Sequence, residues 1–152
     1  MYPANSIASS PFIPPVLALA SWTFAMEAWM YAKRIPAMRR TGVKLEPTMT
    51  GEQWNAKMPP DSRWPADNYN HLHQQPTVFY AVALTMAMQA SGNEGGAASP
   101  LDVQLAWGYV GLRVVHSLIQ ASSNTIGTRF LVFSVSSFVL LGMTVRSIMA
   151  VP

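Results

Sequence analysis

The sequence predicts an all-α fold, an integral membrane four-helix bundle that forms a single domain over residues 1–152. Half of the residues are apolar and only 11% are Asp, Glu, Lys or Arg, whereas soluble domains carry about 25%. Four apolar segments approach the roughly 20 helical residues that cross about 30 Å of hydrocarbon. We expect spans over residues 12–32, 67–90, 101–121 and 129–150. A soluble bundle is the alternative, but 152 residues are too few to cover four such helices.

The ends of these segments carry residues that start helices. Pro14 and Pro15 stand where a first helical turn tolerates proline. The apolar part of the second span begins at Pro76, but Asp67 is a good N-cap, so its helix is expected to start there. Ser99 or Pro100 would start the third helix, and residues 122–128 form a tight polar connection to the fourth.

The connection over residues 33–66 is predicted to be a cytoplasmic loop. Within it, residues 34–63 hold four prolines and show neither helical nor strand periodicity. Seven of the ten basic residues lie in it: Lys33, Arg34, Arg39, Arg40, Lys44, Lys57 and Arg63. Because basic loops stay in the cytoplasm, four spans put both the N and C termini on the non-cytoplasmic side.

The same composition argues against several classes of function. The basic residues sit in a Pro-rich connector rather than among aromatics on one face, so we expect no nucleic-acid partner. The absence of cysteine excludes disulfides and a cysteine nucleophile. His71 and His73 are two residues apart, point to different faces of a helix and have no evident third ligand, so we expect no metal site.

Ionisable and amide side chains at membrane depth are the candidate functional residues, because such groups are costly there. Glu27 lies in the inner third of the first span and is expected to pair with a basic residue or to sit at headgroup level. Asn70, His73 and Gln74 have helical spacing at the head of the second span, so they are expected to face inward together. A solvated helix start is the alternative.

The third span carries a polar stripe. Arg113, His116 and Gln120 are spaced at i, i+3 and i+7 on an otherwise apolar helix. A buried Arg needs partners, and Glu27 and His116 are candidates alongside the Asn at the head of span two. The stripe fits an interhelical network or an anion-binding wall equally well. Arg129 opens the fourth span, where it opposes the helix macrodipole and thus favours a functional reason.

The segments NYNHLHQQPTVFYAVAL (residues 68–84) and AWGYVGLRVVHSLIQASSNTIGTRF (residues 106–130), in this order among four spans, resemble the MAPEG family, the membrane-associated proteins of eicosanoid and glutathione metabolism. The resemblance implies a homotrimer of four-helix subunits that binds glutathione between neighbours near the cytoplasmic end. It also implies that an Arg at the start of span four stabilises the glutathione thiolate, while apolar substrates approach from the lipid.

The match is partial at the level of residues. Asn70, Arg113, His116 and Arg129 stand where the resemblance expects them, but Ala66, His73 and Gln120 replace an Arg, a Glu and a Tyr of the family pattern. The resemblance thus implies Arg129 as the catalytic residue and glutathione as the cofactor. The expected cofactor-binding residues are Asn70, His73, Gln74, Arg113, His116 and Gln120.

Two functions follow as hypotheses. The first is a membrane-bound, glutathione-dependent transferase or peroxidase acting on a lipophilic small molecule. The second is a non-catalytic lipid-binding or scaffolding subunit of a larger membrane complex, which the missing Arg and Glu favour; whether the chain is an enzyme is left open. A channel or transporter is weaker, because no broken helix with paired Gly or Pro is evident. The expected location is a bacterial inner membrane.

Overall fold

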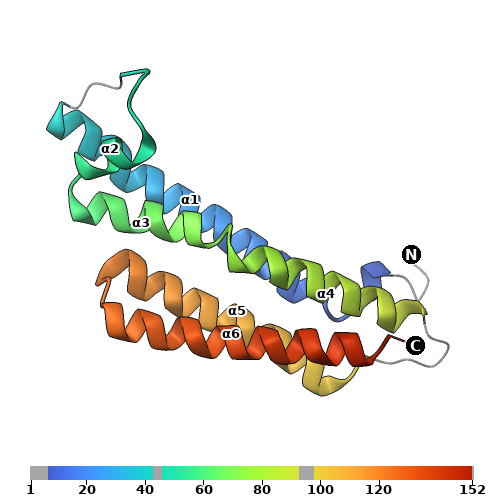
Figure 1. Cartoon of the computed structure of the whole chain (residues 1–152). Coiled ribbons are helices and arrows are strands. Elements are labelled where there is room, and N and C mark those ends of the chain that lie inside the picture. Colours follow the sequence, from blue (N-terminus) through green and yellow to red (C-terminus); the bar gives the residue numbers. More distant parts are fainter. Residues whose placement is uncertain (1–6, 43–45, 93–97, 152) are drawn as a thin grey trace.

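The computed structural model describes residues 7–42, 46–92 and 98–151, and these are helical, without a strand. After a short 3-10 helix η1 (Ile7–Ser9) come α1 (Ile13–Thr41), α2 (Gly51–Ala56), α3 (Pro60–His71), α4 (Gln75–Gly92), α5 (Pro100–Ser122) and α6 (Ile126–Met149). The all-α prediction is confirmed. The start of α1 and the end of α6 lie at the same end of the bundle (Figure 1). Orientation in a membrane stays a prediction.

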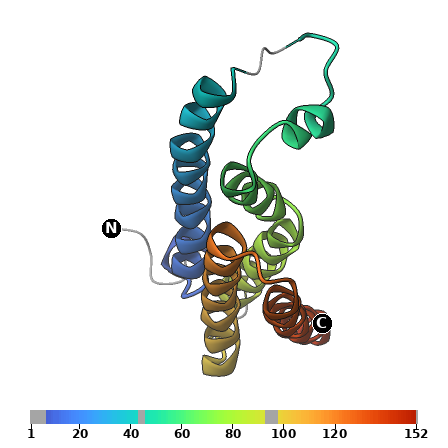
Figure 2. The same ribbon diagram turned by 90° about the vertical axis from the view of Figure 1, so that its left-hand side faces the viewer.

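The bundle has two sides. The helix α1 runs beside α3 and α4, and α5 pairs with the antiparallel α6 on the other side (Figure 1). Figure 2 shows α5 between α1 and α6, with α2 set apart from the bundle. Where the sides meet, the ring of Phe79 stacks on that of Tyr109, with centroids 4.6 Å apart. The apolar core thus joins α4 to α5 and positions the polar residues next to them.

The region over residues 33–66 is more helical than predicted. The helix α1 continues to Thr41, where Gly42 adopts a left-handed conformation (φ 62°) and donates its N–H to the carbonyl of Met38. The helix α2 begins with a capping box between Thr50 and Gln53. The prediction of an aperiodic loop over these residues is therefore wrong. Capping interactions define the helices there, in segments that are too polar to show an apolar periodicity.

The small helix α2 is held against α1 by one side chain. The guanidinium of Arg34 lies over the ring of Trp54, 3.9 Å from its centroid, and donates to the Oδ1 of Asn55. Burial lowers the pKa of Arg34, and the nearby Asp67 opposes that shift. An arginine predicted to lie in an aperiodic loop thus anchors the next element.

The predicted second span is two helices. The helix α3 ends at His71, the chain makes a tight turn over Leu72 to Gln74, and α4 then begins. Pro76 explains the break, because it has no N–H to donate to the carbonyl four residues earlier and its ring clashes with that carbonyl. The fourth helix also begins earlier than predicted, at Ile126, so that Arg129 lies in its first turn.

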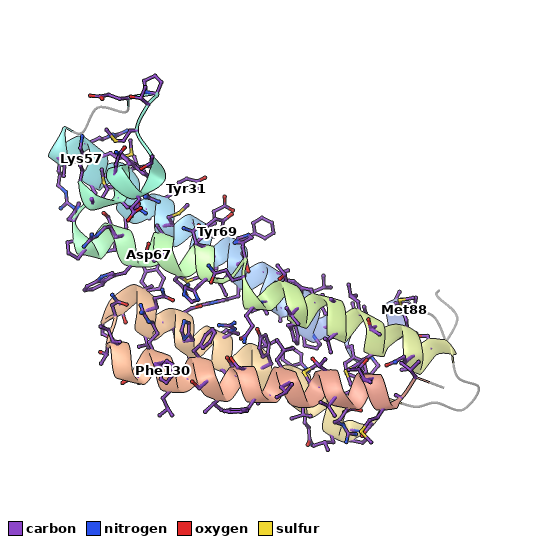
Figure 3. The ribbon with its side chains drawn as sticks, in the orientation of Figure 1. Tyr31, Lys57, Asp67, Tyr69, Met88 and Phe130 are labelled. Carbon is purple, nitrogen blue, oxygen red and sulfur yellow. The ribbon has the colours of Figure 1, made fainter. Side chains whose placement is uncertain are left out.

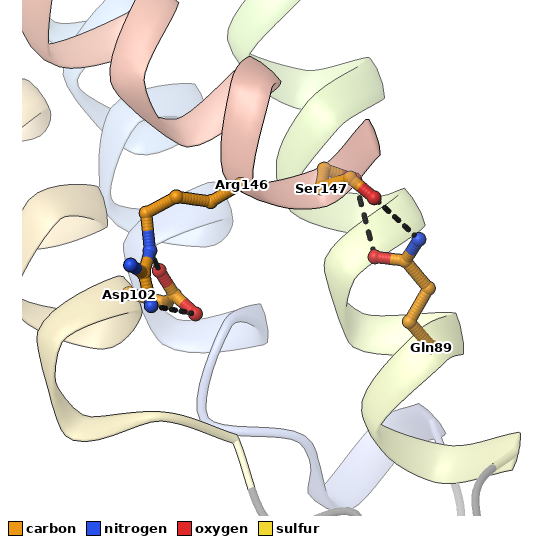
Figure 4. A network of polar contacts seen from close by, with 4 residues as sticks. All are labelled: Gln89, Asp102, Arg146 and Ser147. Carbon is orange, nitrogen blue, oxygen red and sulfur yellow. Dashed lines mark hydrogen bonds and ion pairs between the residues drawn. The ribbon is translucent and has the colours of Figure 1, made fainter. Parts of the chain in front are cut away.

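Among the described residues, α6 alone is long and apolar enough to cross a membrane by length and composition. Its outer face is markedly apolar: Ile126, Phe130 and Phe138 are each at least 70% exposed. The other three spans remain predictions. At its far end, α6 is tied to α5 by an ion pair of Arg146 with Asp102, and to α4 by two hydrogen bonds between Gln89 and Ser147 (Figure 4).

Candidate functional site

The polar stripe predicted on α5 is buried. Arg113, His116 and Gln120 are each at most 2% exposed, which confirms that they share one inward face. Because 3.6 residues make a turn, positions i, i+3 and i+7 align against α3 and α6. The three side chains then meet different partners, and these partners define the site.

Arg113 is held by neutral groups rather than by the predicted partners. Its Nε donates to the Oη of Tyr109 over 2.9 Å, and an Nη donates to the Oε1 of Gln75. Gln75 in turn donates to the Oγ of Ser137 on α6, at 2.7 Å. The ring of Phe133 lies 5.2 Å from the guanidinium carbon. Gln75, which is not among the predicted site residues, therefore links Arg113 to α4 and α6.

His116 uses both ring nitrogens within the protein. Its Nδ1 is 3.2 Å from the carbonyl oxygen of Arg129, so this nitrogen must carry the proton and donate. Its Nε2 is 3.1 Å from the Oε1 of Gln120. Because a neutral ring protonated at Nδ1 can only accept at Nε2, the amide of Gln120 must be turned so that its NH₂ takes the place of this oxygen. His116 thus positions the backbone of the first turn of α6.

Arg129 lies in that first turn and its side chain is directed by the preceding connection. An Nη of Arg129 donates to the Oδ1 of Asn124 over 2.6 Å. Asn124 has a left-handed backbone (φ 48°), a conformation that asparagine tolerates better than most residues. In the part of the chain that the structure describes, neither Arg129 nor Arg113 forms an ion pair with a carboxylate.

Two of these residues, His116 and Arg129, border an open hollow of about 260 Å³, here called the Arg129 hollow, whose lining consists of His71, His116, Ile126, Arg129, Phe130 and Phe133. The rings of His71 and His116 are 5.8 Å apart. Of the two histidines, only His71 keeps a nitrogen free, because its buried Nδ1 has no hydrogen-bond partner within the described residues. The hollow is therefore lined by a cation, by an imidazole ring that makes no hydrogen bond within the described residues, and by apolar walls.

The head of the second span does not join this site in the single chain. Asn70, His73 and Gln74 are exposed, so the prediction that they face inward together is wrong. The break in the helix after His71 removes the regular spacing on which that prediction relied. His73 instead lines a second hollow of about 220 Å³ that includes Glu27, here called the Glu27 hollow. The structure thus brings together four of the seven predicted residues, namely Arg113, His116, Gln120 and Arg129.

Gln75 and His71 were missed because sequence spacing alone does not reveal their contacts. Gln75 lies 38 residues from Arg113. His71 had been considered only as a metal ligand. The sequence did contain a signal for both residues. A buried arginine needs hydrogen-bond acceptors, and several amide side chains lie in the stretch before Pro76.

Comparison with known proteins gives one match. The sequence profile of the MAPEG family matches residues 12–149, nearly the whole chain, and the chain therefore belongs to this family. No curated protein and no solved structure matches the chain. Membership makes it a membrane-associated protein of the glutathione-related transferase and lipid-metabolism kind.

Proposed function

We propose, from its membership of the MAPEG family, that this chain is a membrane-bound glutathione-dependent transferase or peroxidase acting on a lipophilic electrophile at the Arg129 hollow. The observation that carries the proposal is a pair of arginines held only by neutral acceptors beside an apolar hollow, within the described residues. Such a site attracts an anion and an apolar molecule together. Glutathione supplies the anion as its thiolate.

Arg129 stabilises that thiolate. A free thiol has a pKa of about 8.5, and an adjacent cation raises the fraction ionised at neutral pH. The position of Arg129 in the first turn of α6 adds the positive end of the helix dipole. Asn124 orients the guanidinium without cancelling its charge, because an amide oxygen is neutral.

His71 accepts the thiol proton. The His71 ring lines the hollow and makes no hydrogen bond within the described residues; its Nδ1 is buried, so its Nε2 is the proposed acceptor, whereas both nitrogens of His116 are engaged. The proton moves from sulfur to the imidazole, and the sulfur electron pair then forms a bond to the electrophilic atom of the substrate. The leaving group departs with its bonding electrons and takes up the proton from His71.

The walls of the hollow fit the second substrate. Ile126 and Phe130, at least 70% exposed, extend the apolar surface of α6 away from the hollow, so a lipophilic molecule can reach it from the lipid. We further propose a homotrimer in which the exposed Asn70 and Gln74 of a neighbouring copy contact glutathione. The membrane topology proposed is four spans with both termini outside, in a bacterial inner membrane.

A non-catalytic lipid-binding or scaffolding subunit is the second candidate. One observation favours it: Ala66 is buried and apolar where family members carry an arginine, and His73 lies at the Glu27 hollow rather than beside Arg129. Two charged contacts to glutathione would then be missing. Constant co-purification with a larger membrane complex would support this role.

The deciding experiment is glutathione binding and turnover by the purified protein in nanodiscs. We expect binding at millimolar glutathione, together with conjugation to 1-chloro-2,4-dinitrobenzene or reduction of cumene hydroperoxide. Arg129→Ala should lower kcat/KM by about 10²–10³-fold, the usual loss for a group that stabilises developing charge. Arg40→Ala, at the exposed end of α1, is the matched control and should be unchanged. Absence of glutathione binding overturns the proposal.

A further inference from the structure

The Glu27 hollow takes no part in the proposed chemistry. It lies between α1 and the break that separates α3 from α4, and its lining includes Phe24, Glu27, Tyr69, His73 and Tyr80. Figure 3 shows Tyr69, at this hollow, on the α3 side near α1, whereas Phe130, at the Arg129 hollow, lies on α6. The two hollows are therefore separate sites in one chain.

The carboxylate in this hollow lacks a partner. Glu27 is half-buried on the helix that carries the first predicted span, and within the described residues it forms neither a hydrogen bond nor an ion pair. A carboxylate at membrane depth is costly unless a cation or a donor meets it. By contrast, the half-buried Asp102 at the other end of the bundle is paired with Arg146. The carboxylate of Glu27 is therefore free, among the described residues, to pair with a cation that enters the hollow.

The other walls favour a cation. No Lys or Arg is among the described residues that line the hollow, and the aromatic rings of Phe24, Tyr69 and Tyr80 are there instead. Aromatic faces attract ammonium groups. The Nδ1 of His73 donates to the carbonyl of Tyr69 over 2.8 Å, and its ring packs edge-on against that of Tyr69 at 4.5 Å. The ring of His73 is thereby fixed as part of the wall.

We propose that the Glu27 hollow binds the ammonium group of an amphiphilic amine. The carboxylate of Glu27 would pair with the ammonium, the aromatic rings would surround it, and the alkyl chain would lie over Phe24, which is 71% exposed. Glutathione is a poor fit, because its two carboxylates would lie near Glu27 without a basic side chain in the lining. The site therefore selects a monocation with an apolar tail.

The test uses three probes of one chain length. Octylamine is protonated at neutral pH, octanol is neutral and octanoate is anionic. Calorimetric titration of the full chain in maltoside detergent, without glutathione, should show saturable binding of octylamine at least about tenfold tighter than that of the other two. Glu27→Gln should lower octylamine affinity about tenfold, to the level of octanol, since a hydrogen bond to a charged group contributes at least about that factor.

Two further variants keep the test decisive. Glu52→Gln removes an exposed carboxylate from α2 and should leave octylamine binding unchanged. Phe24→Ala removes a ring that is largely exposed, so the fold should be unaffected. The affinity for octylamine should fall about threefold. Equal affinity for octylamine and octanol, or no effect of Glu27→Gln, overturns the proposal.

Two other results would also overturn it by giving Glu27 a different partner. If Glu27→Gln changes the oligomer mass in detergent, the carboxylate faces a neighbouring copy. If glutathione displaces octylamine and Glu27→Gln weakens glutathione binding, the carboxylate belongs to the glutathione site. Because octylamine binding is measured without glutathione, its failure leaves the proposed activity untouched.

Discussion

The two ends of the α5–α6 pair treat their arginines in opposite ways. Near the end of α6, Arg146 pairs with the carboxylate of Asp102, which neutralises the charge of the arginine. At the other end, Arg113 and Arg129 are oriented by a phenol and by amide oxygens. A carboxylate fixes an arginine and neutralises it, whereas an amide fixes it and leaves its charge available. The first end therefore holds a neutralised arginine, whereas the second holds two arginines that no carboxylate among the described residues neutralises.

After Arg129→Ala, the largest effect is expected from His71→Gln. Losing the proton acceptor should slow glutathione conjugation at neutral pH about 100-fold, the lower end of general-base contributions. The deficit should shrink as the pH approaches 8.5, because glutathione then ionises without help. Stopped-flow or steady-state rates across pH measure this. His73→Gln, at the other hollow, is the control, and an equal loss there would argue against a specific role for His71.

The substitution Asn124→Asp tests the difference between the two ends directly. The change keeps the shape of the side chain and its tolerance of a left-handed backbone, but it gives Arg129 a carboxylate partner like that of Arg146. We expect kcat/KM to fall about tenfold while the protein stays folded. Asn55→Asp makes the same change beside Arg34 and should leave kcat/KM unaltered. Unchanged activity in Asn124→Asp would refute the role given to the charge of Arg129.

Gln75→Leu tests how the buried arginine is held. The substitution removes the acceptor of Arg113 and the donor to Ser137, so the free energy of unfolding should fall by about 1–3 kcal/mol. Unfolding followed by circular dichroism in detergent measures it. The neighbouring Gln74→Leu alters an exposed side chain and should stay within about 0.5 kcal/mol. Equal effects of the two variants would mean that the hydrogen bonds of Gln75 add no stability.

The smallest effect is expected at the neutralised end. Asp102→Asn breaks an ion pair whose arginine side chain is 40% exposed, and exposed pairs contribute little. The midpoint of thermal unfolding should shift by no more than about 2 °C, with less difference at high salt. A drop as large as that of Gln75→Leu would show that the pair is more protected from solvent than its exposure indicates.

The sequence predicted what depends on local periodicity. The stripe of Arg113, His116 and Gln120 is buried as expected. An apolar helix can shield three aligned polar side chains only by turning them toward the neighbouring helices. The partners could not be read in the same way. Gln75 meets Arg113 from the first turn of α4, directly after the break between α3 and α4, and the same break removes the helical spacing that related Asn70 to His73 and Gln74. Contacts across such a break depend on tertiary packing, which the periodicity of the sequence does not reveal.

The length of α1 has a consequence for the surroundings of the protein. At 1.5 Å per residue its 29 residues extend about 43 Å, some 13 Å more than the hydrocarbon layer. In the proposed topology, the extra turns carry Arg39 and Arg40 through the headgroup region, where anionic lipids attract them. In this topology, the contact of Arg34 with the ring of Trp54 determines how far α2 lies from the bilayer.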